Sequence, residues 1–177
     1  MSDSNLIAES AGAAGATARY SIGIDLGTTH CALSYVDRSA SDGDTVAQGV
    51  LDIPQLTGPA SVDAKPLLPS FLYLPHESEL TPADMALPWG ASDGYVVGEF
   101  ARSRGAATPI RLVSSAKSWL CHPGVDRRAP LLPADAPAEV PRVSPLTASI
   151  RYLSHLRWAW DQAHPEAPFD AQDITVT

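Results

Sequence analysis

The frequency of proline is the feature that most constrains what this chain can fold into. The sequence has 16 prolines in 177 residues, about twice the average usage. Proline ends or kinks helices and is confined to the starts or edges of strands, so we expect short elements separated by rigid loops. Five prolines fall within residues 121–143 and three within residues 75–94. We predict a linker or loop in the first segment and an insertion or long surface loop in the second.

The composition still allows a packed core. Apolar residues make up 45% of the chain and charged residues 18%, which is typical of a globular protein of one good-sized domain or two small ones. Tyr20, Ile22 and Ile24 recur at period two, which predicts a strand. A Gly-containing break and a second apolar run at 31–36 then predict a hairpin. We predict further strands at 46–53, 67–74, 95–97 and 174–177, and loops at 37–44 and 55–65.

Three helices are expected from apolar spacing and end signals. A short one at 99–104 is stopped by Gly105. The second follows a Thr108-Pro109 start and has apolar residues at three- and four-residue spacing up to position 120. The longest begins at a Ser144 cap with Pro145 in the first turn. Its predicted apolar stripe consists of Leu146, Ile150, Leu153, Leu156 and Trp160. We expect Trp119, Trp158 and Trp160 to be core or interface aromatics. The chain is therefore expected to contain both strands and helices.

Charge and cysteine content exclude several classes of function. Twelve Lys and Arg against 20 Asp and Glu give a net charge of −8, which argues against a nucleic-acid binder. Cys31 and Cys121 are too few and too far apart for a disulfide scaffold or a zinc site. No apolar run is long enough to span a membrane. Residues 1–19 lack the basic start and apolar stretch of a secretory signal, so we expect a flexible tail on a cytoplasmic protein.

Residues 22–29, Ile-Gly-Ile-Asp-Leu-Gly-Thr-Thr, carry the strongest chemical signal. Asp25 ends a predicted strand, where its carboxylate can reach a divalent cation directly or through waters. Gly27 allows a tight turn with positive φ and the close approach of another backbone. Thr28 and Thr29 offer hydroxyls and consecutive backbone N–H groups for phosphate oxygens. The pattern predicts a magnesium-phosphate cradle; the alternative is an Asx-type hairpin with a polar turn.

These residues resemble the first phosphate motif of the seventy-kilodalton heat-shock chaperones, the DnaK-like family. Further stretches are similar to this family in its order: Leu68-Pro-Ser-Phe71, Val97-Gly-Glu-Phe-Ala-Arg102, Ser114-Ser-Ala-Lys-Ser-Trp-Leu120 and Ile174-Thr-Val176. The resemblance runs from Tyr20 to Thr177. It implies the N-terminal portion of an actin-like ATPase (ribonuclease H-like) fold, of the α/β class with a mixed sheet and flanking helices. Residues 20–177 would form a truncated first lobe of a nucleotide-binding domain.

The resemblance also assigns roles to individual residues. Asp25 would help to hold hydrated Mg²⁺, and Gly27, Thr28 and Thr29 would bind the phosphates of ATP. The family's catalytic lysine maps onto Arg102, as in the chaperones dedicated to iron–sulphur assembly; arginine keeps the charge but has a bulkier planar fork. His30 is expected to be a spacer. Lys117 is expected to be exposed or to bridge the lobes.

The family's remaining ATP machinery and its peptide-binding domain have no counterpart before Thr177. We therefore expect an N-terminal part of a divergent chaperone, whose longer parent couples ATP binding and hydrolysis to binding unfolded polypeptides, with co-chaperones as partners. The chain alone should hydrolyse ATP weakly or not at all, because phosphoryl transfer needs groups from both lobes. One alternative is a non-catalytic module that binds a nucleotide or a partner. Another is a different member of the actin and sugar-kinase superfamily.

Overall fold

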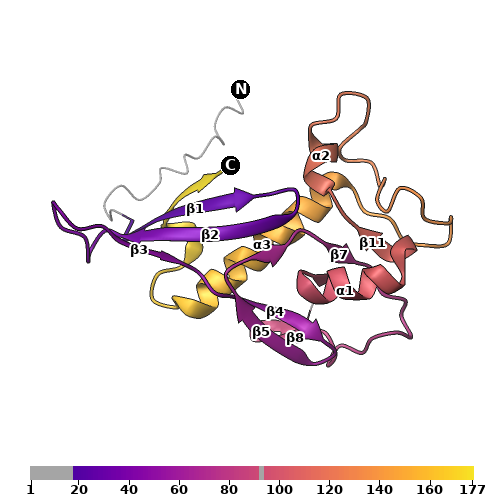
Figure 1. Ribbon diagram of the computed structural model, residues 1–177, viewed down its shortest axis with the longest axis horizontal. Coiled ribbons are helices and arrows are strands. Elements are labelled where there is room, and N and C mark those ends of the chain that lie inside the picture. Colours follow the sequence, from indigo (N-terminus) through magenta and orange to yellow (C-terminus); the bar gives the residue numbers. More distant parts are fainter. Residues whose placement is uncertain (1–17, 92–93) are drawn as a thin grey trace, which may run out of the picture.

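The predicted hairpin is present, and it lies at the centre of a mixed α/β fold. The computed structural model describes residues 18–91 and 94–177 (Figure 1). β1 (Tyr20–Leu26) and β2 (His30–Asp37) are antiparallel. A three-residue turn joins them. The predicted tail at 1–19 lies almost entirely outside the described residues.

Three more strands complete this sheet. β3 (Ala47–Val50) is antiparallel to β2, and β12 (Asp173–Val176) is parallel to β1. The strand order is β12-β1-β2-β3, and β6 (Leu68–Pro69) pairs with the turn end of β2. The predicted mixed sheet is confirmed. The strand predicted at 46–53 is present in shorter form, as Ala47–Val50, and the strand predicted at 174–177 is present one residue earlier, as Asp173–Val176.

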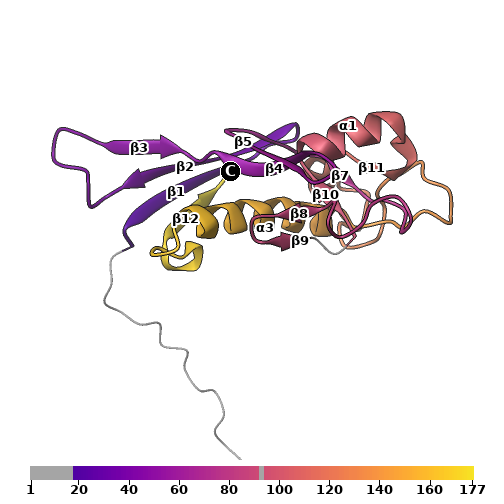
Figure 2. The same cartoon turned by 90° about the horizontal axis from the view of Figure 1, so that it is seen from below.

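One face of this sheet is covered by α3 (Pro145–Ala163), which Figure 2 shows lying along β1 and β2. Ile22 and Ile24 each expose only 2% of their surface, and Trp160 of α3 exposes none. Their burial follows from the period of two along the strand, which puts alternate side chains on the helix side. The helix start is as predicted, because the Ser144 hydroxyl accepts a hydrogen bond from the Thr147 backbone N–H at 2.9 Å.

The buried face of α3 differs from the predicted stripe. Leu156 and Trp160 are buried as expected, but Ile150 is 52% exposed, and Tyr152 and His155 are buried instead. The Tyr152 hydroxyl and His155 Nε2 both bond to backbone carbonyl oxygens. Hydrogen bonds of this kind allow polar side chains to enter a core, so the stripe based on apolar residues alone was wrong in part.

The loop predicted at residues 55–65 is wrong, because β4 (Ile53–Gly58) and β5 (Ser61–Lys65) form an antiparallel hairpin there. Gln55 is fully buried within β4. Its Nε2 donates to the Leu67 carbonyl oxygen, and its Oε1 accepts from the Glu99 backbone N–H. A buried glutamine interrupts the apolar alternation by which strands are identified in a sequence.

A third small sheet lies under α1 (Glu99–Ala107). Its strand order is β10-β7-β11, with bounds Val96–Val97, Leu72–Tyr73 and Leu112–Val113. The predicted stop of this helix at Gly105 is wrong. Gly105 lies inside α1, where a Cβ would overlap the side chain of Leu112, so packing and not helix termination requires glycine here.

The helix predicted up to residue 120 is also mostly wrong. A 3₁₀ turn at Pro109–Arg111 is followed by β11, and only Ala116–Leu120 is α-helical (α2). Val113 is fully buried and pairs with Leu72 in the sheet. Ser115 has a left-handed φ of 54°, which separates the strand from α2. The sheet pairing therefore prevails over the helical spacing.

The proline-rich segments have little regular structure, as predicted. Among its described residues, the segment 75–94 contains a two-stranded hairpin, β8 (Ala86–Leu87) and β9 (Gly90–Ala91), and no other helix or strand. Residues 121–143 have no helix or named strand. A second 3₁₀ turn, Phe169–Ala171, precedes β12.

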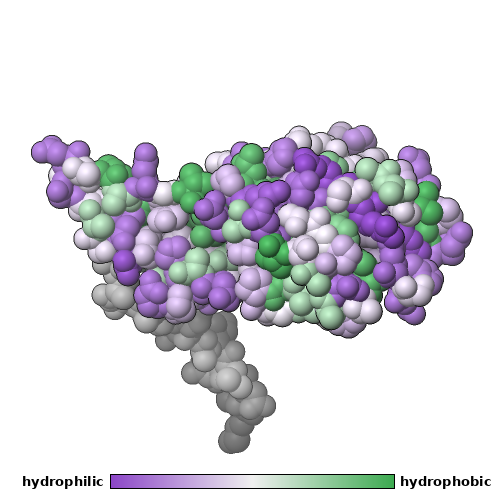
Figure 3. Space-filling view, turned by 60° about the horizontal axis from the view of Figure 1, so that its bottom comes forward, coloured by the Kyte–Doolittle hydropathy of each residue, from purple (hydrophilic) through white to green (hydrophobic). Residues whose placement is uncertain are grey.

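On the face in Figure 3, hydrophobic residues form small groups among polar ones. No helix within the described residues is long and apolar enough to cross a membrane.

Candidate functional site

The turn between β1 and β2 carries the residues predicted to form the phosphate cradle. Asp25, Thr28 and Thr29 are all exposed. A Cβ on Gly27 would overlap the carbonyl oxygen of His30, so the predicted close approach of another backbone is confirmed. The prediction of a positive φ at Gly27 is wrong, because Gly27 is not one of the glycines with a positive φ among the described residues. Glycine is needed for space and not for a left-handed conformation.

Two of the backbone N–H groups of this turn are free to donate to a ligand. No backbone hydrogen bond joins the N–H of Thr28 or Thr29 to another of the described residues, whereas the Gly27 backbone N–H interacts with the Cys31 thiol. The carboxylate of Asp25 lies beside them, with Oδ1 3.7 Å from the ideal Cβ position of Gly27. Consecutive N–H groups that lack a protein acceptor are suited to bind an anion. The turn therefore presents N–H donors for an anion and one carboxylate side by side.

Ser70 holds the turn from behind. It is 2% exposed. Its backbone N–H donates to the Thr29 carbonyl oxygen at 2.8 Å, and its hydroxyl donates to the Gly27 carbonyl oxygen at 2.8 Å. The Ser70 hydroxyl also lies 3.3 Å from Cys31 Sγ, and the Tyr152 hydroxyl donates to the Ser70 carbonyl oxygen at 3.2 Å. The carbonyl oxygens of Gly27 and Thr29 are thus held toward the core. This limits the conformations that the turn and its N–H groups can adopt.

A cation lies closer to this turn than the sequence indicated. The Nζ of Lys117, in α2, is 3.4 Å from the carbonyl oxygen of Thr177, which in turn accepts from the Leu26 backbone N–H at 3.1 Å. Burial raises the pKa of the Cys31 thiol, and the charges of Asp25 and Lys117 also act on this pKa, in opposite directions. Lys117 is therefore close to the end of β1, where it can attract an anionic ligand.

Arg102, the predicted counterpart of the catalytic lysine, is engaged elsewhere. Its guanidinium bonds to both carboxylate oxygens of Glu99 in α1, at 2.8 and 2.9 Å. α1 itself is tied to the turn region, because the Gly98 N–H donates to the Phe71 carbonyl oxygen next to Ser70. Within the described ranges, no hydrogen bond or ion pair joins Arg102 to the turn. The structure thus brings Asp25, Gly27, Thr28 and Thr29 together and leaves Arg102 apart from them.

The donor set around the turn limits how a metal ion could bind. Residues 18–91 and 94–177 contain no group of three or more His, Cys, Asp or Glu side chains placed to hold a metal. Asp25 borders a depression of about 250 Å³ that is also lined by Ser34, Thr175 and Thr177. Mg²⁺ typically keeps several waters and binds one or two carboxylates together with phosphate oxygens. The Asp25 carboxylate fits this mode of binding, in which a nucleotide supplies the remaining ligands.

Sequence reasoning missed the roles of Ser70, Tyr152 and Lys117. Ser70 lies in the Leu68-Pro-Ser-Phe71 stretch, so the motif order was a signal that this segment is near the turn. No local pattern indicated Lys117 or Tyr152.

Comparisons with protein-family models and with curated proteins find no match to this sequence.

Proposed function

We propose that this chain binds the phosphates of a magnesium-bound nucleoside triphosphate, with ATP as the expected ligand, at the β1–β2 turn. The observation that carries the proposal is the pair of free backbone N–H groups at Thr28 and Thr29 beside the carboxylate of Asp25. The Thr28 and Thr29 hydroxyls would add donors to the phosphate oxygens. Bound Mg²⁺ would neutralise phosphate charge. Lys117 would add long-range attraction, which this acidic chain otherwise lacks.

We further propose that the chain is the first lobe of an actin-like nucleotide-binding domain of the DnaK-like type. Supporting observations are the mixed sheet with flanking helices and the contact between two stretches that resemble the family, the turn and the Ser70 segment. In a longer protein of this type, nucleotide binding would be coupled to holding and releasing unfolded polypeptide, with co-chaperones as partners.

The experiment that tests the proposed site is calorimetric titration of ATP, with and without Mg²⁺, into the wild-type chain and two variants. Asp25→Ala should weaken binding at least about tenfold in the presence of Mg²⁺ and have less effect without it, because the carboxylate acts through the cation. Thr28→Ala should weaken binding in both conditions.

Asp44→Ala is the matched control, because Asp44 is an exposed carboxylate in the loop between β2 and β3. It should bind ATP as the wild-type chain does. If the folded wild-type chain does not bind ATP, or if all three variants bind alike, the site is not at this turn.

A second candidate function is a non-catalytic nucleotide-binding module. The pairing of Arg102 with Glu99 favours it, because the guanidinium would have to leave this carboxylate before it could stabilise charge on a transferring phosphoryl group. Phosphate release from ATP distinguishes the two candidates. Binding without turnover in any longer form of the protein would support the module, and turnover that is lost in Arg102→Met would support the ATPase.

Lys117→Met should lower the affinity for ATP about threefold at low ionic strength, the size expected for a partly exposed charge interaction. Added salt should reduce this difference because it screens exposed charges. The measurement is the same titration at two salt concentrations. Lys65→Met, at the end of β5, removes the chain's other lysine and should leave the affinity for ATP unchanged. If both variants lower the affinity equally, the effect comes from the net charge of the chain and not from the position of Lys117.

A further inference from the structure

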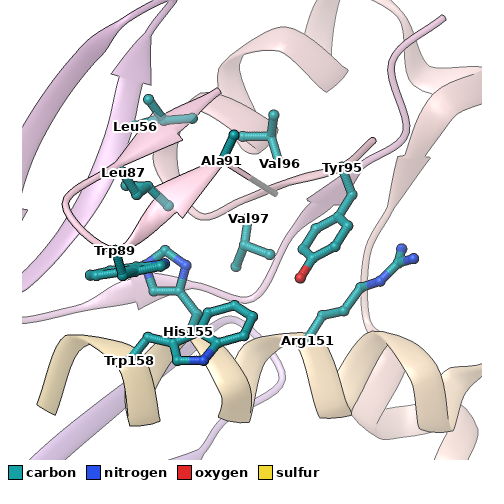
Figure 4. Close-up of a pocket in the computed structure, with 10 residues that line it drawn as sticks. All are labelled: Leu56, Leu87, Trp89, Ala91, Tyr95, Val96, Val97, Arg151, His155 and Trp158. Atoms are coloured by element: carbon teal, nitrogen blue, oxygen red, sulfur yellow. The ribbon is translucent and has the colours of Figure 1, made fainter. Parts of the chain in front are cut away.

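A second candidate site is a partly open cavity between α3 and the strands β4, β8, β9 and β10. Its volume is about 230 Å³. Leu56 and Val97 form part of an apolar wall, and Trp89, His155 and Trp158 add aromatic surface. In Figure 4, Trp89 and His155 lie together at one end, and Arg151 rises from α3 beside Tyr95 at the other. None of the lining residues belongs to the β1–β2 turn.

Arg151 is the charged group of this cavity. The other residues that line it are apolar or aromatic. Among them, His155 is uncharged at neutral pH, because burial lowers its pKa to about 4. The lining among the described residues therefore combines a largely hydrophobic surface with a single positive charge. Cavities of this composition are typical of sites for small organic ligands.

One nitrogen of the Arg151 guanidinium, Nη1, is buried without a hydrogen-bond acceptor among the described residues. The guanidinium carbon Cζ lies 4.0 Å from the centre of the Tyr95 ring, a cation–π contact. Burial also lowers the pKa of this guanidinium. A buried cationic donor without an acceptor is costly, and a carboxylate is the group that best relieves this cost.

The size of the cavity limits the hydrophobic part of a ligand. A cavity of about 150 Å³ with apolar walls can hold benzene. A volume of about 230 Å³ therefore has room for one six-membered ring and a short acidic arm. Edge-to-face packing is available for the ring, as Trp89 and His155 already pack at 89° with their ring centres 5.1 Å apart.

We propose that this cavity binds a small aromatic carboxylate, with its ring against Trp89 and Trp158 and its carboxylate at Arg151. Free small molecules and the phenylalanine-like end of a peptide share this chemistry. The site is independent of the proposed nucleotide site, so either proposal can fail without the other.

The test uses 3-phenylpropionate as the probe and its neutral amide, 3-phenylpropanamide, as the comparison. Binding is measured by saturation-transfer NMR and by the change in tryptophan fluorescence, since Trp89 and Trp158 line the site. We expect the acid to bind at ~1 mM or tighter and the amide at least about tenfold more weakly, because only the acid pairs with the charge. A peptide ending in phenylalanine with a free carboxylate distinguishes a peptide end from a free acid as the better ligand.

Arg151→Met should weaken binding of the acid at least about tenfold and bring it to the level of the amide. Arg157→Met is the matched control, because Arg157 is on the exposed side of the same helix. It should bind the acid as the wild-type chain does, and both variants should bind ATP unchanged. If Arg151→Met fails to fold, the comparison of acid with amide in the wild-type chain still decides. Equal affinity for acid and amide, no binding of the acid by the folded chain, or wild-type affinity in a folded Arg151→Met would overturn the proposal.

Discussion

Lowering the pH from 7 to 4 should reduce the free energy of unfolding by about 3 kcal/mol through His155 alone. His155 is 3% exposed, and its Nε2 is 2.8 Å from the Pro54 carbonyl oxygen. Burial lowers its pKa from 6.5 to about 4, and the bond to Pro54 offsets this only in part. Between these values the unfolded chain binds a proton that the folded chain does not. Above pH 6.5 this histidine is neutral in both states and does not lower the free energy of unfolding. As the pH falls toward 4, the free energy of unfolding decreases.

The measurement is urea unfolding at several pH values for the wild-type chain and for His155→Gln. The comparison is needed because carboxylates also titrate in acid; Asp37, for example, has a pKa well below its usual range because of its hydrogen bond to Arg19. His155→Gln keeps these carboxylates and removes the histidine, so its stability should change less between pH 6.5 and 4. His122→Gln replaces an exposed histidine and should keep the wild-type dependence. Identical slopes for wild type and His155→Gln would show that His155 does not titrate as proposed.

His155 also illustrates which parts of the fold could be predicted from the sequence. Regular apolar spacing with clear end signals correctly predicted the β1–β2 hairpin and α3 with its Ser144 cap, although the same kind of signal failed for the helix expected up to residue 120. Elements that bury polar residues were not. Gln55 hid the β4–β5 hairpin, and His155 and Tyr152 changed the buried face of α3. Each of these side chains is satisfied by a partner more than ten residues away, which no local pattern can indicate.

The same distinction applies to the candidate site. Asp25, Gly27, Thr28 and Thr29 lie within five consecutive residues, so their type and spacing were enough to predict the turn; its use as a phosphate site stays a prediction. The groups that support the turn come from distant parts of the sequence. Ser70 is 43 residues from Gly27, and Lys117 is 60 residues from Thr177, whose carbonyl oxygen it approaches. Their placement depends on how the sheets and helices pack, and is therefore a property of the tertiary structure.

Ser70→Ala should lower the free energy of unfolding by about 2 kcal/mol, the range expected when a buried hydrogen-bond acceptor loses its donor. The substitution leaves the Gly27 carbonyl oxygen without the 2.8 Å bond from the Ser70 hydroxyl and removes the contact with Cys31 Sγ. The backbone bond from Ser70 to Thr29 should persist, so the turn should loosen at Gly27 rather than unfold.

A loosened turn must be ordered again when phosphate binds, so Ser70→Ala should also reduce the affinity for ATP about tenfold, which corresponds to about 1.4 kcal/mol. Urea unfolding and calorimetric titration measure the two effects on the same samples. Ser149→Ala is the matched control, because Ser149 is 4% exposed and its hydroxyl donates to the Pro145 carbonyl oxygen within α3 rather than to the turn. It can lose some stability but should keep full affinity. A folded Ser70→Ala chain that binds ATP as tightly as Ser149→Ala would show that Ser70 stabilises the fold without positioning the turn.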